Sequence, residues 1–288
     1  MQLPEYLARI GYSGEVTPTV AALRNLHRRH MFSVPFENLD IPLHREIVLD
    51  LEHIYDKIVR HHRGGFCYEQ NAIFAWALRV IGFQADMLSA GVARPDGSYS
   101  PDFDHMCLLV RVPESGKSGR EPEEGDASWL ADVGFGDSFV EPIPFLLDHI
   151  HRERGWEYQI TRDGDGYLLR RRSTVSNSEA NRAKADWKHQ YRFTLPPRQL
   201  SDYSQMCNYH QTSPLSHFTQ NRICSRATPD GRVTLSGTAG GTTLIVTENG
   251  TRTDTPVESP ADFERLLKQH FGIQLTGFSA GVHADNDP

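Results

Sequence analysis

Apolar residues recur at helical spacing through the first part of the chain. This spacing predicts three helices, over about 17–30, 51–62 and 67–82. Thr17-Pro18 is a start signal for the first helix, and Asp50 can cap the second. Gly64-Gly65 must end the second helix, and Gly82 can end the third. The first 82 residues are therefore expected to be mainly helical.

The pattern then changes to short apolar or alternating segments. They are separated by turn dipeptides such as Asp96-Gly97 and Asp163-Gly164. The segments expected to form strands are 84–92, 105–112, 128–133, 157–160, 167–171 and 190–194. Short strands at this spacing are typical of an antiparallel sheet or barrel. The polar stretch 113–127, rich in Gly, Pro and charged residues, is interpreted as a surface loop.

The last part of the chain mixes both patterns. Strands are expected near 232–235 and 242–247, and a helix should begin at Ser259-Pro260 and end at Gly272. With 288 residues, the chain is long enough for two or three subdomains. Helices, then strands, then a mixture of the two indicate the α+β class.

Composition narrows the range of functions. The formal net charge of −7 argues against nucleic acid as the main partner, since a phosphate backbone requires a basic face. No apolar stretch approaches the roughly 20 residues that span a bilayer, and the first residues do not resemble a signal peptide. The four cysteines are far apart, so a disulfide framework is not expected and a reducing cytoplasm fits.

One cysteine has surroundings that suggest chemistry. Cys67 follows Gly64-Gly65 and opens a predicted helix, in the segment RGGFCYEQN. The positive end of a helix and its unpaired backbone N–H groups favour the thiolate, which is the nucleophile. The same groups could hold an oxyanion. Without further residues, a small apolar residue at a helix start explains Cys67 about as well.

A nucleophilic cysteine also needs a base and a group that orients the base. His105 begins the predicted strand 105–112, and Asp132 lies in the predicted strand 128–133. A buried carboxylate needs a partner, and an imidazolium is suitable. His61 and His62 are nearer to Cys67 in sequence, but the end of their helix would have to fold back over the thiol.

A second histidine pattern suggests a metal site. His27-x-x-His30 has the spacing of metal ligands on a helix, but no further ligand is in view. We therefore interpret these two histidines as part of a solvated helix face. No metal site is expected.

Several motifs, in one order, resemble the arylamine N-acetyltransferase family over roughly residues 1–275. The segment RGGFCYEQN is similar to the active-site cysteine motif of this family, R-G-G-x-C-x-E-x-N. Further similar segments are SVPFENL (33–39), DHMCLLV (104–110), ADVGFG (131–136) and, more loosely, SPLSHF (213–218). The 27 positions between His105 and Asp132 exceed the expected spacing, and the 113–127 loop accounts for the excess.

The resemblance implies a fold and a set of site residues. The expected parts are a helical domain over 1–83, a β-barrel domain over 84–200 and an α/β lid domain over 201–288, with a papain-like catalytic core. Cys67, His105 and Asp132 would form the catalytic triad. The implied substrate-binding residues are Phe36, Gly134, Phe135 and Gly136, and the residues implied to brace the site are Arg63, Glu69 and Asn71. Arg63 and Glu69 could instead form an ordinary surface ion pair.

The resemblance also implies an activity. It is transfer of an acetyl group from acetyl-CoA to arylamines, arylhydrazines or N-hydroxyarylamines, as in xenobiotic metabolism. The mechanism would be ping-pong through an acetyl-cysteine, with no tightly bound cofactor and with neither nucleic acid nor membrane as partner. Alternatives with the same fold are an amide synthase and an enzyme that uses another donor such as malonyl-CoA. A cysteine protease or transglutaminase is a more distant alternative.

Overall fold

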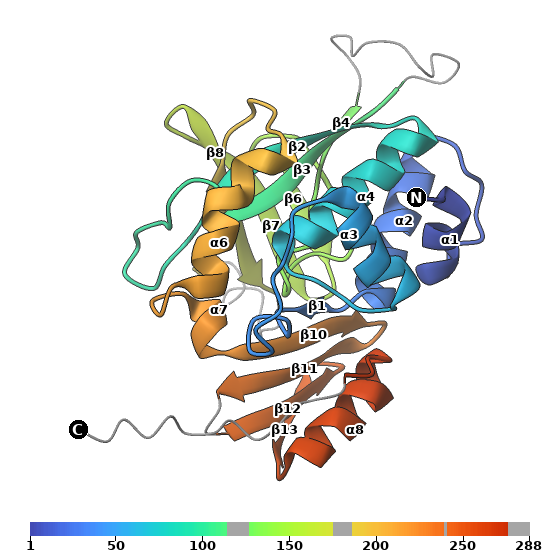
Figure 1. Cartoon of the computed structure of the whole chain (residues 1–288). Helices are drawn as coiled ribbons and strands as arrows, with labels where there is room; N and C mark the ends of the chain where they lie inside the picture. Colours follow the sequence, from blue (N-terminus) through green and yellow to red (C-terminus); the bar gives the residue numbers. More distant parts are fainter. Residues whose placement is uncertain (114–126, 175–185, 239–240, 276–288) are drawn as a thin grey trace.

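The helical part of the chain surrounds one long buried helix. The computed structural model describes residues 1–113, 127–174, 186–238 and 241–275. Its N-terminal helices are α1 (Leu3–Arg9), α2 (Val20–Ser33), α3 (Leu51–Tyr55), the π-helical turn η1 (Asp56–Arg60) and α4 (Cys67–Ile81). Most residues of α4 are buried, and α1, α2 and α3 pack around it (Figure 1).

Short local signals set the ends of these helices. The Asp50 carboxylate accepts hydrogen bonds from the first backbone amides of α3, as predicted. Gly82 ends α4 with a φ of 110°, a conformation that suits glycine. The prediction for α2 was wrong by about one turn. Its cap is the Thr19 side chain, which accepts from the Ala22 amide, and not the Thr17-Pro18 pair.

The middle of the chain forms an eight-stranded antiparallel sheet in the order β5-β4-β3-β2-β9-β8-β7-β6. Its strands are β2 (Gln84–Val92), β3 (His105–Val112), β4 (Ala127–Ala131), β5 (Ile143–Pro144), β6 (Ile150–Glu153), β7 (Trp156–Asp163), β8 (Gly166–Ser173) and β9 (Lys188–Phe193). The predicted strands 84–92 and 105–112 coincide with β2 and β3. The sheet curves around a core of aromatic and aliphatic side chains (Figure 1).

A second antiparallel sheet has the order β1-β10-β11-β12-β13. Four of its strands come from the last part of the chain, β10 (Arg222–Thr228), β11 (Gly231–Thr238), β12 (Gly241–Glu248) and β13 (Thr251–Val257). Its first strand, β1 (Phe36–Glu37), comes from the helical part and pairs with β10. Helix α8 (Pro260–Phe271), with the predicted Ser259 cap and Gly272 end, packs on this sheet (Figure 1).

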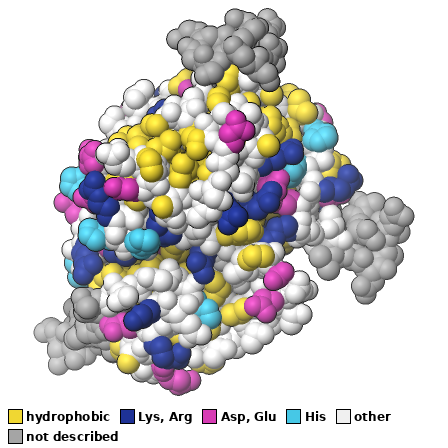
Figure 2. Space-filling view, turned by 90° about the vertical axis from the view of Figure 1, so that its right-hand side faces the viewer, with side chains coloured by type: hydrophobic (Ala, Val, Ile, Leu, Met, Phe, Trp, Pro, Cys, Tyr) yellow, Lys and Arg dark blue, Asp and Glu magenta, His cyan; other side chains and the backbone are white. Residues whose placement is uncertain are grey.

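Between the two sheets, the turn η2 (Leu200–Tyr203) leads into α6 (Ser204–Thr212), which is followed by α7 (His217–Gln220). Figure 1 shows α6 and α7 one after the other, beside the large sheet and above β10. This segment was not predicted as helical. The surface of the helical part mixes positive and negative side chains, with apolar side chains gathered toward its upper part (Figure 2).

The proposed surface loop falls mostly on 114–126, outside the described residues. The domain boundaries at 83 and 200 stay predictions. No helix in the described part of the chain is long and apolar enough to cross a membrane.

Candidate active site

Cys67 is the first residue of α4, and its side chain is buried. The preceding loop lies against the segment before β1. The Gly65 amide donates to the Pro35 carbonyl over 3.3 Å, and the Glu37 amide donates to the Gly65 carbonyl over 3.0 Å. A Cβ on Gly64 would lie 1.9 Å from the Pro35 oxygen, so this approach requires glycine. The glycine pair therefore lets the chain turn tightly into the nucleophile position.

His105 and Asp132 meet because their strands are neighbours. His105 begins β3 and Asp132 follows β4, and these two strands pair antiparallel. The His105 Nε2 atom lies 2.7 Å from Asp132 Oδ2, and both side chains are buried. The structure thus brings the predicted base and carboxylate into direct contact across 27 positions of sequence.

The thiol of Cys67 lies at the same strand end. The backbone of Met106, the residue after His105, acts to lower the pKa of this thiol. Cys67 and His105 line one cavity. An ionised Asp132 only accepts hydrogen bonds, so Nε2 of His105 carries the proton and Nδ1 is left as the acceptor. Nδ1 is therefore the ring atom able to take the thiol proton.

The electrostatics of the thiol oppose the expectation of a free thiolate. Burial raises the pKa of Cys67 well above its usual value, and the carboxylates of Asp104 and Asp132 raise it further. Burial would also raise the pKa of Asp132, but His105, Asn71 and the Gly134 amide hold it below its usual value. The carboxylate is therefore charged, and the sulfur loses its proton most readily when His105 takes it up.

Asn71 connects all three parts of the site. Its Nδ2 donates to Asp132 Oδ1 over 3.0 Å and to the Met106 carbonyl over 2.7 Å. Its Oδ1 accepts from the Val133 amide over 3.0 Å. Asn71 lies one helical turn after Cys67, so these bonds tie the cysteine helix to the strand ends of His105 and Asp132.

Gly134 lies directly on the backbone of the nucleophile. A Cβ there would be 2.7 Å from the Cys67 Cα atom and 2.7 Å from Asn71 Nδ2. The Gly134 amide also donates to Asp132 Oδ1 over 3.0 Å. Glycine thus permits the close packing of the aspartate segment on α4.

Arg63 and Glu69 do not form the surface ion pair considered as an alternative. Both are buried. Arg63 bonds to Glu37 and Asp40 over 2.8 and 2.9 Å. Glu69 accepts from Lys57 over 2.8 Å and from the Phe66 amide over 3.2 Å. Each therefore holds the loop before Cys67 from a different side.

The charged side chains around this loop shift one another's pKa values. Burial would lower the pKa of Arg63, but Glu37 and Asp40 raise it above its usual value. Burial raises the pKa of Glu69, and the opposing effect of Lys57 does not cancel this. Removing one partner of a buried ion pair strongly destabilises the folded protein, because the other charge is left buried without a partner.

The interpretation of His27 and His30 as a solvated helix face was wrong. Both are fully buried. They lie on the buried face of α2, together with its apolar residues. Each nitrogen of the two rings has a hydrogen-bond partner. Among the described residues, no group of three or more His, Cys, Asp or Glu side chains could hold a metal ion.

The other histidines considered as a base lie elsewhere. His61 lines a second cavity, together with Asp40 and Lys57, and does not line the one that Cys67 faces. His62 follows η1 with a φ of 52°, at the turn that leads to the glycine pair. His105 is therefore the histidine that geometry favours.

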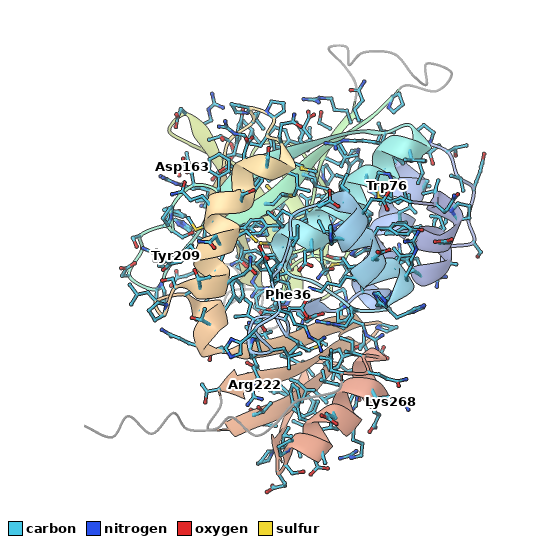
Figure 3. All side chains as sticks on the ribbon, viewed as in Figure 1. Phe36, Trp76, Asp163, Tyr209, Arg222 and Lys268 are labelled. Carbon is cyan, nitrogen blue, oxygen red and sulfur yellow. The ribbon has the colours of Figure 1, made fainter. Side chains whose placement is uncertain are left out.

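The cavity in front of Cys67 has a volume of about 410 Å³. Three of the predicted substrate-binding residues line it, namely Phe36, Gly134 and Phe135. The fourth, Gly136, does not; a Cβ there would contact the Phe36 ring at 3.6 Å. Phe36 and Tyr209, both labelled in Figure 3, reach the cavity from β1 and from α6.

Most of the residues that line the cavity opposite the triad were not predicted from the sequence. The lining residues not predicted are Val92, Arg94, Ser100, Asp104, Tyr209, His210, Leu215, Ser216, His217 and Phe218. His210 lies 3.3 Å from an Asp104 carboxylate oxygen. The loosely matching segment 213–218 was the available signal, since four of its residues line the cavity.

Comparison with known proteins identifies the family of this chain. The family model described as N-acetyltransferase matches residues 19–280. A pineal-gland arylamine N-acetyltransferase from Gallus gallus is 32% identical over 96% of this chain and 95% of its own length. Arylamine N-acetyltransferase 1 from Homo sapiens is 31% identical, over 99% of this chain and 98% of its own length.

Solved structures are similar over nearly the whole chain. An arylamine N-acetyltransferase from Salmonella typhimurium has a TM-score of 0.80 at 30% identity, covering 97% of this chain and 94% of its own. The enzyme from Mycobacterium marinum, solved in complex with CoA, has a TM-score of 0.78 at 26% identity and covers 94% and 93%. The expected α+β fold, with helices, a barrel-like sheet and a C-terminal sheet, is confirmed. The chain is an enzyme of the arylamine N-acetyltransferase family.

Proposed function

We propose that this enzyme transfers an acetyl group from acetyl-CoA to the nitrogen of arylamines, arylhydrazines or N-hydroxyarylamines through an acetyl-Cys67 intermediate. The observation that carries the proposal is the contact of His105 with Asp132 beside a buried thiol at a helix start. The solved relative that holds CoA supports the donor. A nucleophilic cysteine suits a reducing compartment such as the cytoplasm.

The first half-reaction acetylates Cys67. His105 takes the thiol proton on Nδ1 as the Cys67 sulfur attacks the thioester carbon of acetyl-CoA. The tetrahedral intermediate breaks its bond to the CoA sulfur, and His105 returns the proton to that sulfur. The charge of Asp132 stabilises the imidazolium and keeps the ring in one tautomer.

The second half-reaction transfers the acetyl group from Cys67 to the amine. The amine nitrogen attacks the acetyl carbon on Cys67, and His105 accepts the nitrogen's proton. The bond to the Cys67 sulfur then breaks, and His105 gives the proton back to the sulfur. Aromatic amines and hydrazines are largely unprotonated at neutral pH, unlike alkylamines, so their nitrogen lone pair is available.

The shape of the site favours small acceptors over polypeptides. The cavity is about 410 Å³ and is lined partly by the aromatic rings of Phe36, Phe135 and Phe218. Cys67 lies within it with only 3% of its surface exposed. A flat aromatic amine fits such a cavity. A protease or transglutaminase needs an open groove for an extended chain, and hydrolysis of labelled casein tests that alternative.

Intact-mass measurement tests the proposal. Acetyl-CoA alone should add one acetyl group to the protein, on Cys67, and release CoA before any amine is present. Initial rates against both substrates should then give parallel lines. Intersecting lines with no covalent adduct would show direct transfer in a ternary complex and would contradict the proposal.

A second candidate is the same chemistry with an anionic acyl donor such as malonyl-CoA. The observation in its favour is Arg94, the one lysine or arginine among the described residues that line the cavity. Its guanidinium makes no ion pair with any described carboxylate. It could bind a carboxylate on the acyl group. Faster loading of Cys67 by malonyl-CoA than by acetyl-CoA, lost in Arg94→Gln, would establish this candidate.

A further inference from the structure

His27 makes two hydrogen bonds to the segment that carries Asp132. Its Nδ1 lies 2.7 Å from the Val140 carbonyl oxygen, and its Nε2 lies 3.1 Å from the Asp132 backbone nitrogen. The side chain is fully buried on α2. Its ring stacks on Phe139 at 5.6 Å and meets the edge of Phe74 at 5.6 Å. The imidazole therefore contacts the segment 132–140 at both of its ends.

The chemistry of the partners determines the protonation of this ring. A carbonyl only accepts, so Nδ1 carries the hydrogen, and a backbone amide only donates, so Nε2 must keep its lone pair. Burial lowers the pKa of His27 to about 4, against the opposing effects of Val140, Asp132 and Glu141. His30, the nearest histidine on α2, is also kept neutral by burial. At neutral pH, His27 is thus uncharged and held in one tautomer by its two hydrogen bonds.

The segment 132–140, which His27 contacts at both ends, contains several parts of the site. Asp132 contacts His105, Gly134 lies on the Cys67 backbone, and Phe135 lines the cavity. Asn71, His105 and the Gly134 amide hold the Asp132 carboxylate, and His27 alone among the described side chains accepts from its backbone amide. His27 does not line the cavity, so any effect on the reaction acts through the segment 132–140.

We propose that His27 is a positioning residue for acyl transfer, which holds the segment 132–140 on α2 and so sets the place of the Asp132 carboxylate against His105. The inference rests on the proposed function, because it assigns Asp132 to the triad. Loss of this contact leaves a buried amide unpaired and lets the carboxylate move. Supporting residues of this kind typically change activity about ten- to a hundredfold when removed.

Two substitutions at His27 separate positioning from packing. His27→Leu keeps an apolar side chain but removes both hydrogen bonds. His27→Gln retains an oxygen that can accept from the Asp132 amide and an NH₂ group that can donate to the Val140 carbonyl. Leu23→Ala is the matched control, since Leu23 is fully buried on the same helix and has no polar contact. It should lower the melting temperature without removing either hydrogen bond from His27 to the segment.

The measurement is the single-turnover rate of Cys67 acetylation by acetyl-CoA, at a temperature where each variant is folded. We expect His27→Leu to acetylate about ten- to a hundredfold more slowly than the wild type. His27→Gln should recover most of this loss, and Leu23→Ala should react at the wild-type rate despite its lower melting temperature.

Three results would overturn the inference. They are a wild-type rate in His27→Leu, no recovery in His27→Gln, or a loss in Leu23→Ala equal to that in His27→Leu. If His27→Leu does not fold, His27→Asn replaces it, because the shorter amide cannot reach both partners. A wild-type protein that is not acetylated at all would instead contradict the proposed function.

Discussion

The two walls of the cavity differ in how they are built. On one side, Cys67, His105 and Asp132 are all buried, and hydrogen bonds join Asp132 to His105 and to Asn71 on the helix that Cys67 begins. On the other side, α6, α7 and the turn between them present partly open side chains. Leu215 is 79% exposed and Tyr209 is 39% exposed. We therefore expect substitutions in the triad wall to impair the enzyme, whereas substitutions in the facing wall should be tolerated.

The physical reason lies in the cost of an unpaired buried group. The buried polar atoms of the triad wall have lost contact with water and depend on hydrogen bonds within the protein. Exposed apolar side chains on the facing wall have no such dependence, and most substitutions there should cost little stability. This difference predicts that chemistry will be sensitive at the first wall and that acceptor preference will be set at the second.

The largest effect is expected at the nucleophile. Cys67→Ala should fold normally but retain less than about a hundredth of the wild-type turnover, because no alternative nucleophile is available. The other three cysteines are buried, and none of them lines the cavity. Turnover with a simple arylamine, followed with a circular dichroism check of folding, measures this. Turnover above that level would remove Cys67 from the role assigned to it.

The next largest effect is expected at Gly134. Gly134→Ala places a methyl group against the backbone of Cys67, which cannot move without shifting the helix start. We expect a loss of about 1–3 kcal/mol in the free energy of unfolding. The acetylation rate should fall about a hundredfold, since a displacement near 1 Å is enough for this.

Gly241→Ala is the matched control, because a Cβ there meets no atom within 4 Å. It should leave both the free energy of unfolding and the acetylation rate close to wild type. Equal behaviour of the two variants would show that the aspartate segment is not tightly packed on α4, and the contrast between the walls would weaken.

A smaller and graded effect is expected from pH. Burial lowers the pKa of His27 to about 4 and that of His30 to about 3, whereas the unfolded chain protonates near 6.5. Between these values the unfolded state binds more protons, so stability is full above pH 6.5 and is lost as the pH falls toward 4. Each histidine should contribute a loss of about 1.4 kcal/mol per pH unit in that window.

Urea unfolding of the wild type and of His30→Gln at pH 7 and pH 5 measures this dependence. His30→Gln removes one of the two buried histidines, so its free energy of unfolding should fall less between the two pH values. The expected difference is roughly 2 kcal/mol, from 1.5 pH units at the same slope. An identical fall in both proteins would mean that His30 is not kept neutral by burial.

The smallest effect is expected on the facing wall. Leu215→Ala should change the free energy of unfolding by less than about 0.5 kcal/mol, because the side chain is mostly exposed. Acetylation of Cys67 by acetyl-CoA should proceed at the wild-type rate. The KM for bulky arylamines should rise, by less than about tenfold, since a few buried CH₂ groups are involved. A large loss of the acetylation rate would show that this wall takes part in the chemistry.

Local features of this protein were predictable from the sequence. The glycine pair, the capping residues and the alternation of apolar positions placed Cys67 at a helix start and His105 at a strand start. These features depend on neighbours in the chain, and so does the α8 helix between Ser259 and Gly272. The order of motifs, as a resemblance, added the family and the α+β fold.

Features that depend on distant contacts were decided by the tertiary structure. His27 and His30 have the polarity of surface residues, yet the packing of α2 buries them against Val140, Asp132, Tyr6 and Gln70. The short strand β1 exists because it pairs with β10, nearly 190 residues later.

The thiol of Cys67 shows the same division. The helix start, a local feature, favours the thiolate, but burial and the carboxylates of Asp104 and Asp132 raise its pKa. Those opposing groups lie 37 and 65 positions after Cys67 in the chain. The position of the nucleophile was thus set by local sequence, whereas its protonation depends on desolvation and charges that only the folded chain brings together.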